Sequence, residues 1–316
     1  MGFPGTLTKA EIATGLLIRS IKVNGDYLLC NECSFNQTQE IDTLDSLVQG
    51  GPGRAIANIG AKKFTGSLKF PLRYLKDGTF DPAVKKLINH AQNPISVLKI
   101  DSNHILTHYD ITAEDHSTDN NELLSIDAVV VKSLTVSCEN SGAVSVSAEI
   151  EGMIDTRANS DYVVPNSEQG YLGRALTWGD CNAFRAESSM RTVSNLEFSI
   201  ENSIETPVFL PSYISGMATT RTDQIGLIGV KSVKWSGKVE EFVRKGSDLN
   251  TYIHGGWMVS ENLTLYFGTM KVLFTVPLFN ITEMPASSSV FKRTVTWTGL
   301  TKPNAPLSAG QLITFE

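Results

Sequence analysis

The sequence has few cysteines, no excess of positive charge and no long apolar run. Four cysteines in 316 residues do not make a disulfide framework, so we expect free thiols. With 27 Lys and Arg against 33 Asp and Glu, the formal net charge is −6, which argues against a protein that coats nucleic acid. No apolar run approaches the roughly 20 residues of a membrane helix, and the start, Met1 to Thr6, lacks the pattern of a secretory signal.

Motifs for catalysis and for cofactors are also missing. There is no G-x-S-x-G nucleophile elbow, and Gly50-Gly51-Pro52-Gly53-Arg54 lacks the Lys-Ser/Thr of a phosphate-binding loop. Cys30 and Cys33 form a lone C-x-x-C without a second pair to complete a zinc site, and we expect them on opposite faces of a strand. We therefore expect no catalytic residues, no metal and no cofactor.

One polar segment contains several possible metal ligands. They are His104, His108, Asp110, Glu114, Asp115 and His116. Residues 101–121 are nevertheless polar throughout, as is typical of a solvated loop between strands. We expect such a loop, and a metal site is the alternative.

What the sequence does contain is repeated alternation of apolar and polar residues, the period of half-buried strands. It is clearest in residues 133–138, 144–151, 196–201, 233–235 and 294–298, and residues 263–267 and 271–276 are less strict. The alternation places Trp235 and Trp297 in the core and leaves Glu139, Glu149 and Glu151 exposed.

Two short segments have helical spacing. Asp81-Pro82 supplies an N-cap and a proline at the first helical position, and a helix that begins there should end before Pro94. The second segment begins at Ser247 or Asp248 and stops at Gly255-Gly256.

The order of these elements recurs half a chain later. Phe64-Thr-Gly-Ser matches Trp235-Ser-Gly-Lys, the segment from Glu32 matches that from Glu197, and residues 144–152 match 291–299. A competing match, of residues 131–141 with 193–203, has a much shorter offset and is either chance or a second pair of similar hairpins. We favour the long offset because it also relates the two helices, and we interpret it as a tandem duplication.

The predicted fold is mainly β, with two tandem β-barrel or sandwich domains that each carry one short flanking α-helix. The first domain covers residues 1–158, a polar linker covers 159–174, and the second domain covers 175–316.

The second half resembles the tail tube (major tail) proteins of long-tailed bacteriophages. The resemblance lies in Leu196-Glu-Phe-Ser-Ile-Glu-Asn, Val233-Lys-Trp-Ser-Gly-Lys-Val-Glu, the helix near Asp248, two further strands and a hairpin ending at Thr298-Gly299. Residues 26–155 match more weakly, so the chain resembles the duplicated two-domain form, in which three subunits supply six similar domains to a ring.

This resemblance implies a structural virion protein that self-assembles into stacked homotrimeric or homohexameric rings around a DNA-conducting channel. Its implied partners are further copies of itself, the tape-measure protein, the tail terminator, tail-tip or baseplate proteins, in contractile tails a sheath, and DNA that passes without specific binding. Its implied location is the tail of the virion, after assembly in the host cytoplasm.

Stacked rings need arms that reach the next ring, and two long loops stand at matching places. Residues 43–60 contain Gly50, Gly51, Pro52, Gly53 and Arg54; residues 211–229 contain Gly216, Met217, Arg221, Gly226 and Gly229. Such loops are uncommon in compact domains unless they function, although mobile surface loops are an equal alternative.

Two other functions remain open. The chain is alternatively the inner tube of a contractile tail or injection system, with six subunits per ring, or a tail-tip β-sandwich that binds carbohydrate or a receptor. The last of these predicts an exposed aromatic platform, for which Trp178 and Trp257 are candidates.

Overall fold

The computed structural model describes most of the chain. The described residues are 11–44, 56–94, 98–110, 118–159, 173–185, 188–189, 193–205, 229–242, 257–258, 262–275, 278–283, 292–301 and 312–316. Across these ranges the protein is mainly β with one α-helix, as the alternation predicts, and neither large sheet closes on itself. No helix in these ranges has the length and apolarity to span a bilayer.

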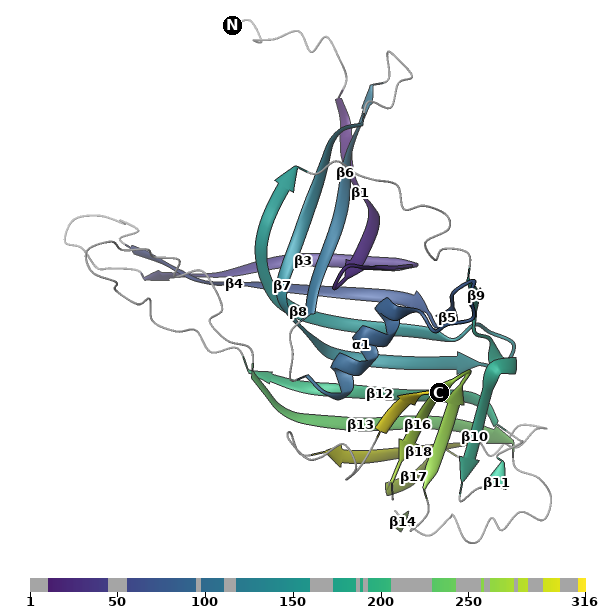
Figure 1. The fold of residues 1–316 in the computed structure, drawn as a ribbon. Coiled ribbons are helices and arrows are strands. Elements are labelled where there is room, and N and C mark those ends of the chain that lie inside the picture. The colour runs from purple at the N-terminus through teal and green to yellow at the C-terminus, as the bar shows by residue number, and fades with distance from the viewer. Residues whose placement is uncertain are drawn as a thin grey trace, which may run out of the picture.

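A 12-stranded antiparallel sheet forms the centre of the molecule (Figure 1). Its strands from the first half are β1 (Glu11–Val23), β2 (Asp26–Leu28), β3 (Glu32–Leu44), β4 (Ile56–Pro71), β6 (Leu98–Asp110), β7 (Thr118–Glu139) and β8 (Ser145–Asn159). Those from the second half are β12 (Val193–Glu205), β13 (Gly229–Phe242), β14 (Trp257–Met258), β17 (Leu278–Glu283) and β18 (Lys292–Thr301).

Strand β7 connects the two halves of this sheet. One edge of β7 pairs with β8 between Glu122 and Ser137. The other edge pairs first with β6, up to Val129, and then with β12, from Ser133 to Glu139. Bulges in the β7–β8 ladder and the positive φ of Ala128 (51°) mark the bend between these two parts.

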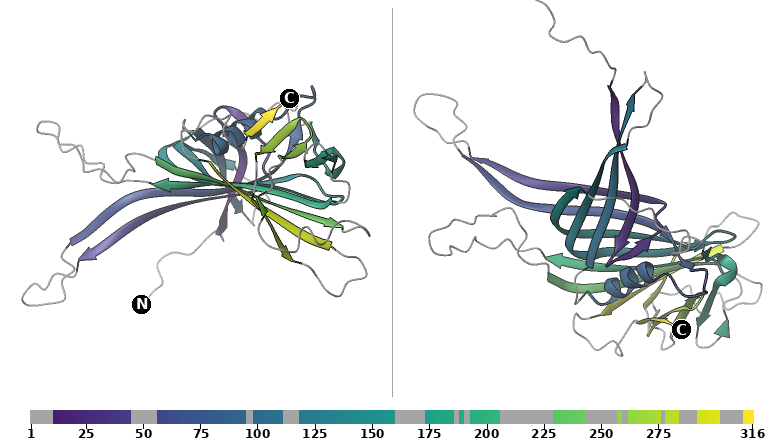
Figure 2. Two further views of the ribbon diagram at one scale, coloured as in Figure 1. Left: turned by 90° about the horizontal axis from the view of Figure 1, so that it is seen from below. Right: turned by 45° about the horizontal axis from the view of Figure 1, so that its top comes forward.

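A smaller sheet has the order β11-β10-β15-β16-β19 and lies over part of the large one (Figure 2). Its strands are β10 (Cys181–Arg185), β11 (Ser188–Ser189), β15 (Leu263–Phe267), β16 (Met270–Phe274) and β19 (Leu312–Phe315). Two short strands, β5 (Arg73–Tyr74) and β9 (Arg174–Ala175), form a separate pair, and the 3-10 helix η1 (Trp178–Asp180) precedes β10.

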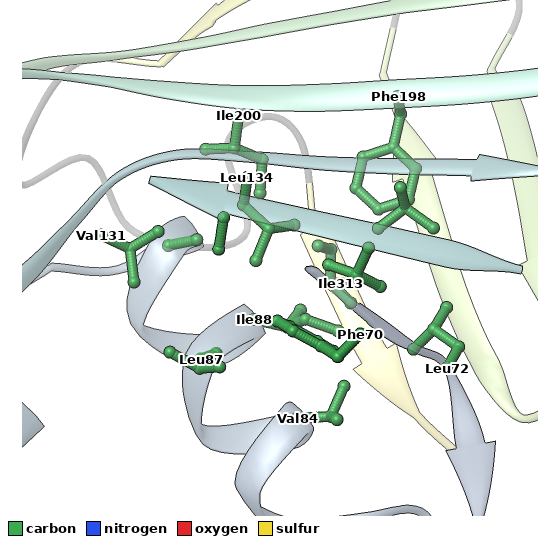
Figure 3. Close-up of a cluster of buried hydrophobic side chains, with 14 of the residues drawn as sticks. Phe70, Leu72, Val84, Leu87, Ile88, Val131, Leu134, Phe198, Ile200 and Ile313 are labelled. Carbon is green, nitrogen blue, oxygen red and sulfur yellow. The ribbon is translucent and has the colours of Figure 1, made fainter. Parts of the chain in front are cut away.

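Helix α1 (Pro82–Gln92) covers the same face of the large sheet as the smaller sheet does, and the core lies between these layers. Asp81 caps it as predicted, through its Oδ1 and the backbone N–H groups of Ala83 and Val84, and the helix ends before Pro94. In Figure 3 its apolar side chains Val84, Leu87 and Ile88 face residues of the sheet such as Leu134 and Phe198. The second predicted helix, at 247–255, lies outside the described residues.

The alternation predicted from the sequence is confirmed where the ladders are regular. In β12, Leu196, Phe198 and Ile200 are buried while their neighbours are not, and Trp235 and Trp297 are each 1% exposed. Glu139 and Glu149 are exposed as expected.

Three local expectations are wrong. Residues 101–110 and 118–121 are strand rather than loop, because β6 and β7 pair there despite their polar composition. Glu151 is 3% exposed, because bulges in β7 shift the register beside it so that Ile150, Glu151 and Gly152 are buried in succession. Cys30 precedes β3 instead of lying on a strand with Cys33.

Most of the predicted linker, residues 160–172, lies outside the described part of the chain. Its last residue, Arg174, belongs to β9 and pairs with Tyr74 of β5. Leu176 is fully buried and exchanges backbone hydrogen bonds with Leu72 and Val144 of the first half. The second predicted domain thus begins in close contact with the first.

Candidate functional site

Four strands in each half pair in the same order. The first-half order is β3-β4-β8-β7, and the second-half order is β12-β13-β18-β17, all antiparallel. The pairing of β7 with β12 joins the two sets into one continuous row of eight strands. A second set of three strands is also ordered alike in the two halves. Strands β1, β6 and β7 pair in that order in the first half, and strands β10, β15 and β16 pair in that order in the second, all antiparallel.

Two glycines in each half lie opposite large apolar residues in these ladders. In the first half, Gly66 of β4 stands opposite Ile150, and Phe64 stands opposite Gly152. In the second half, Gly237 of β13 stands opposite Trp297, and Trp235 stands opposite Gly299. A glycine therefore faces a large apolar side chain twice in each half, in the same diagonal arrangement.

The row of eight strands ends in two edges. At one end, β3 pairs only with β4 among the described strands. At the other end, the outer edge of β17 pairs with β14 only at Leu278 and Phe279, so the outer edge of residues 280–283 has no described strand beside it. Open edges present unpaired N–H and C=O groups that favour addition of another strand.

The face of the row opposite the core is rich in hydroxyl groups, and we call it the hydroxyl face. One line of directly opposed residues crosses five strands: Ser147, Thr135, Ser199, Ser236 and Thr298. Each is exposed or partly exposed, and the Ser199 and Ser236 hydroxyl oxygens are hydrogen-bonded at 2.7 Å. Ser34 and Ser67 make the same contact between β3 and β4, also at 2.7 Å.

Lysines on the hydroxyl face are paired with glutamates. Lys69 contacts Glu32 and Lys234 contacts Glu201, each pair across two strands at 3.3 Å. Lys238 contacts Glu240 of its own strand at 3.2 Å. Glu139, Glu149 and Glu197 add further negative charge to the same face. These three positive charges are thus matched by carboxylates, which disfavours tight binding of phosphates.

The first predicted arm lies between β3 and β4, and the second lies between β12 and β13. Strand pairing continues as far as Leu44 with Ile56, so both ends of the first arm are strand rather than loop, and residues 45–55 lie outside the described part of the chain. Gly229 is likewise the first residue of β13, opposite Glu205, rather than part of a loop. The other candidates are outside the described residues: Gly50, Gly51, Pro52, Gly53, Arg54, Gly216, Met217, Arg221 and Gly226.

The first arm is longer than the sequence predicts. Pairing of β4 with β8 begins only at Phe64, while pairing of β4 with β3 extends to Ile56. Residues 37–44 and 56–63 therefore form a two-stranded ribbon that projects from the sheet (Figure 2).

The residues with possible chemistry form no cluster in the described part of the chain. No group of three or more His, Cys, Asp or Glu side chains there is arranged to hold a metal ion. Cys30 and Cys33 are partly buried free thiols whose pKa values are raised by burial, which makes them poor nucleophiles. His104 and His108 lie on β6, and His116 is outside the described residues.

The described aromatic side chains give little support to a carbohydrate platform. Trp257 lies on β14, and the burial of its side chain is outside the described part of the structure. Trp235 and Trp297 are buried, and Phe274 packs edge-to-face against both. Trp178 of η1 is partly buried against the core.

Comparison with known proteins does not assign the chain. No protein-family model matches the sequence, and no curated protein is detectably similar to it.

Proposed function

We propose that this chain is a structural virion protein, the tail tube subunit of a long-tailed bacteriophage. Copies of it assemble into stacked rings that enclose a DNA-conducting channel. The observation that carries this proposal is the pairing of β7 with β12, which joins two similarly ordered sets of strands edge to edge within one polypeptide.

The proposal includes a tandem duplication of one β unit. Its support is the shared order β3-β4-β8-β7 and β12-β13-β18-β17, together with the glycines Gly66 and Gly237 at equivalent positions. Two long strands of the first half are each matched by two shorter strands in the second half. Strand β7 pairs along its length with β8, whereas β16 pairs with β19 and β17 pairs with β18. Strands β16 and β17 together thus take the place of β7, and β19 and β18 together take the place of β8. Each unit is an open sandwich, and α1 covers the core side of the first unit.

The same edges meet between subunits as within one subunit. In a duplicated chain, β3 is equivalent to β12, and β17 is equivalent to the part of β7 that pairs with β12. The β17 edge of one subunit then pairs with β3 of the next, which satisfies the open N–H and C=O groups of both. Such head-to-tail contacts close into rings. With two units per chain, three subunits supply six units.

The hydroxyl face forms the wall of the channel in this assembly. Short Ser and Thr side chains and neutralised lysines give a smooth surface that does not hold DNA phosphates. The tape-measure protein occupies the channel before DNA does, and the tail terminator and tail-tip or baseplate proteins bind the two ends of the tube.

The experiment that tests this proposal blocks each edge separately. Neighbouring residues in an antiparallel strand direct their N–H groups to opposite edges of the strand. Proline removes the N–H of the residue that it replaces. Of the two variants Asn36→Pro and Gln37→Pro, one therefore keeps the pairing with β4 and loses only an N–H donor on the open edge. Asn280→Pro and Ile281→Pro are the corresponding pair on β17. Circular dichroism identifies the folded member of each pair, and the other member is its matched control.

Each folded edge variant should be monomeric, whereas the wild-type protein forms rings or tubes in negative-stain images and sedimentation. A mixture of the β3-edge and β17-edge variants should give a heterodimer and nothing larger, because each has one intact edge. Wild-type protein that stays monomeric at every concentration, or edge variants that still form rings, would contradict the proposal. Images of wild-type rings should show three subunits; six would indicate the contractile type.

A further inference from the structure

Strand β19 is held on one side by strand β16 and on the other by helix α1. It is an outer strand of the smaller sheet, and among the described strands it pairs only with β16, from Leu312 opposite Leu273 to Phe315 opposite Met270. The helix belongs to the first half of the chain, whereas both strands belong to the second. The two halves therefore share the contacts that hold this strand.

The backbone of Ile313 is hydrogen-bonded to the helix side chain Gln92. Its N–H donates to Gln92 Oε1 at 2.9 Å, and its carbonyl oxygen accepts from Gln92 Nε2 at 3.2 Å. Gln92 Nε2 also donates to Asn89 Oδ1 at 3.2 Å, which orients the carboxamide. Because both backbone polar groups of a residue in an antiparallel strand point to the same edge, those of Leu312 and Thr314 point to β16. The Gln92 carboxamide thus takes the place of a residue in a neighbouring strand.

Two side chains of β19 pack against apolar residues of the first half. Ile313 is 3% exposed and belongs to the buried cluster in Figure 3, which includes Ile88 of α1. The ring of Phe315 packs against Phe80 with their centroids 4.9 Å apart, and Lys85 Nζ lies 5.1 Å from the Phe315 centroid. Backbone pairing therefore holds the strand, and these two alternate side chains determine which sequence fits.

We propose that these contacts form a strand-binding site that accepts β19 from a second copy of the chain as well as from its own. The acceptor site consists of the outer edge of β16 together with Gln92, Ile88, Phe80 and Lys85. Its ligand is an extended segment with the sequence of residues 312–316. This inference does not depend on the proposed function, because the rings proposed above use the β3 and β17 edges of the large sheet.

The edge position of β19 makes this exchange possible. Its only described ladder has four residue pairs, so its departure disrupts no other described strand pairing. The same strand from another copy makes the same hydrogen bonds and side-chain contacts, so the main cost is the loss of intramolecular attachment. That cost falls as the local concentration of copies rises, and exchange therefore increases where copies are held side by side.

The test uses the full chain and a fluorescein-labelled peptide of residues 309–316. In Ile313→Asp a carboxylate replaces a buried apolar side chain, so the chain's own strand should leave the acceptor site. Fluorescence anisotropy should then show one peptide bound per chain, about tenfold or more tightly than to the wild-type chain, whose own strand competes. Circular dichroism verifies the rest of the fold, and Ile313→Ala replaces Ile313→Asp if the latter does not fold.

Matched changes identify the contacts that bind the peptide. In the chain with Ile313→Asp, the added change Gln92→Leu should weaken peptide binding about tenfold, because two hydrogen bonds to the peptide backbone are lost. A peptide with Ile313→Asp should not bind, whereas one with Thr314→Ala should bind normally, since Thr314 is only partly buried. A folded chain with Ile313→Asp that binds no peptide at millimolar concentration, or that binds all three peptides equally, would overturn the inference.

A pull-down tests exchange between two copies. Immobilised chain with Ile313→Asp should retain wild-type chain, which can donate its strand, more strongly than it retains soluble chain with Ile313→Asp. Contacts between the β3 and β17 edges would retain both chains alike, so the difference reports the acceptor site and not ring formation. Equal retention of the two chains would exclude exchange between copies and leave the proposed rings unaffected.

Discussion

Among the described glycines of the large sheet, Gly237 has the least room for a side chain. A Cβ added at Gly237 would overlap the indole of Trp297, which lies directly on that glycine across the β13–β18 ladder. We expect Gly237→Ala to lower the free energy of unfolding by about 2–3 kcal/mol, because neither the backbone nor the buried indole can move away freely. Denaturant unfolding measures this loss.

Substitutions at two other glycines serve as comparisons for that measurement. The Cβ of Gly66→Ala would meet Phe35 at 2.7 Å and both Ile150 and the Ser34 carbonyl oxygen at 3.1 Å, which is less severe than the 2.1 Å approach at Gly237, so its cost should be smaller. Gly179 has nothing closer to its added Cβ than the Thr177 hydroxyl at 3.8 Å, and Gly179→Ala should be nearly neutral. Equal effects at all three positions would show that packing on Trp297 is not the cause.

A second residue-scale prediction concerns pH. The bidentate hydrogen bonds from Arg174, at 2.8 Å each, hold the pKa of Asp180 at about 2, below its ordinary 3.8. A carboxyl whose pKa is lower in the folded state contributes stability above its unfolded pKa and loses that contribution as pH falls through the folded pKa. This contribution should therefore be complete above pH 4 and disappear towards pH 2.

Arg174→Ala should move the pKa of Asp180 from about 2 towards 3.8, as measured by carboxyl titration in NMR spectra. The N–H of Thr177 still donates to Asp180 at 2.9 Å, so part of the shift should remain. An unchanged pKa in Arg174→Ala would assign the whole effect to Thr177.

At the scale of elements, Asp81 supports both the start of α1 and a buried ion pair. Its carboxylate accepts a hydrogen bond from Arg73 Nε at 2.7 Å, and the side chains of Arg73 and Asp81 are only 4% and 1% exposed. Asp81→Ala should lower the free energy of unfolding by about 4 kcal/mol, because it removes the cap and leaves a buried guanidinium without its carboxylate.

Asp26→Ala is the matched control in the same region. Asp26 contacts Lys86 of α1 at 2.7 Å, but both side chains are more than one third exposed. Such pairs contribute less than about 1 kcal/mol. If both variants unfold at the same denaturant concentration, the buried pair contributes no more than the exposed one.

Sequence periodicity predicted the elements whose two faces differ in environment. Helix α1 and strand β12 each have one buried face, so their apolar spacing identified them. Strand β6 and the first part of β7 could not be recognised in this way, because polar residues such as His104 and Glu122 stand opposite each other there. Glu151 shows the other limit, since a bulge in a neighbouring strand changes which side chains are buried.

At the scale of the whole molecule, the sequence predicts a repeated order of elements, which stays a prediction, and it gives no indication of how the strands of the two halves pair. The pairing of β7 with β12 joins residues far apart in the chain, and nothing local in Ser133–Glu139 indicates that partner. The open edges of β3 and β17 were not predicted for the same reason. Strand order across a sheet is a property of tertiary structure.

The projecting ribbon of β3 and β4 makes a prediction at this scale. Deletion of Gly50–Gly53 removes only part of the segment beyond Leu44 and Ile56, so the subunit should fold as before. Rings should still form, because the β3 and β17 edges are intact, but stacking into tubes should be impaired.

Negative-stain images and sedimentation measure ring and tube formation separately. Tubes of normal length from the deletion variant would remove the role of this arm in stacking. Loss of rings as well as tubes would show instead that the segment contributes to contacts within a ring.

Strand β7 also limits how the polypeptide can be divided. If the chain were cleaved between residues 159 and 173, one fragment would expose the unpaired side of β7 and the other would expose the unpaired side of β12. These two strands are each other's pairing partner in the intact protein. The pieces should behave as split-protein halves, which recombine when co-expressed and aggregate when made alone. Reporter tags attached to the two new ends would then show whether β7 and β12 have paired.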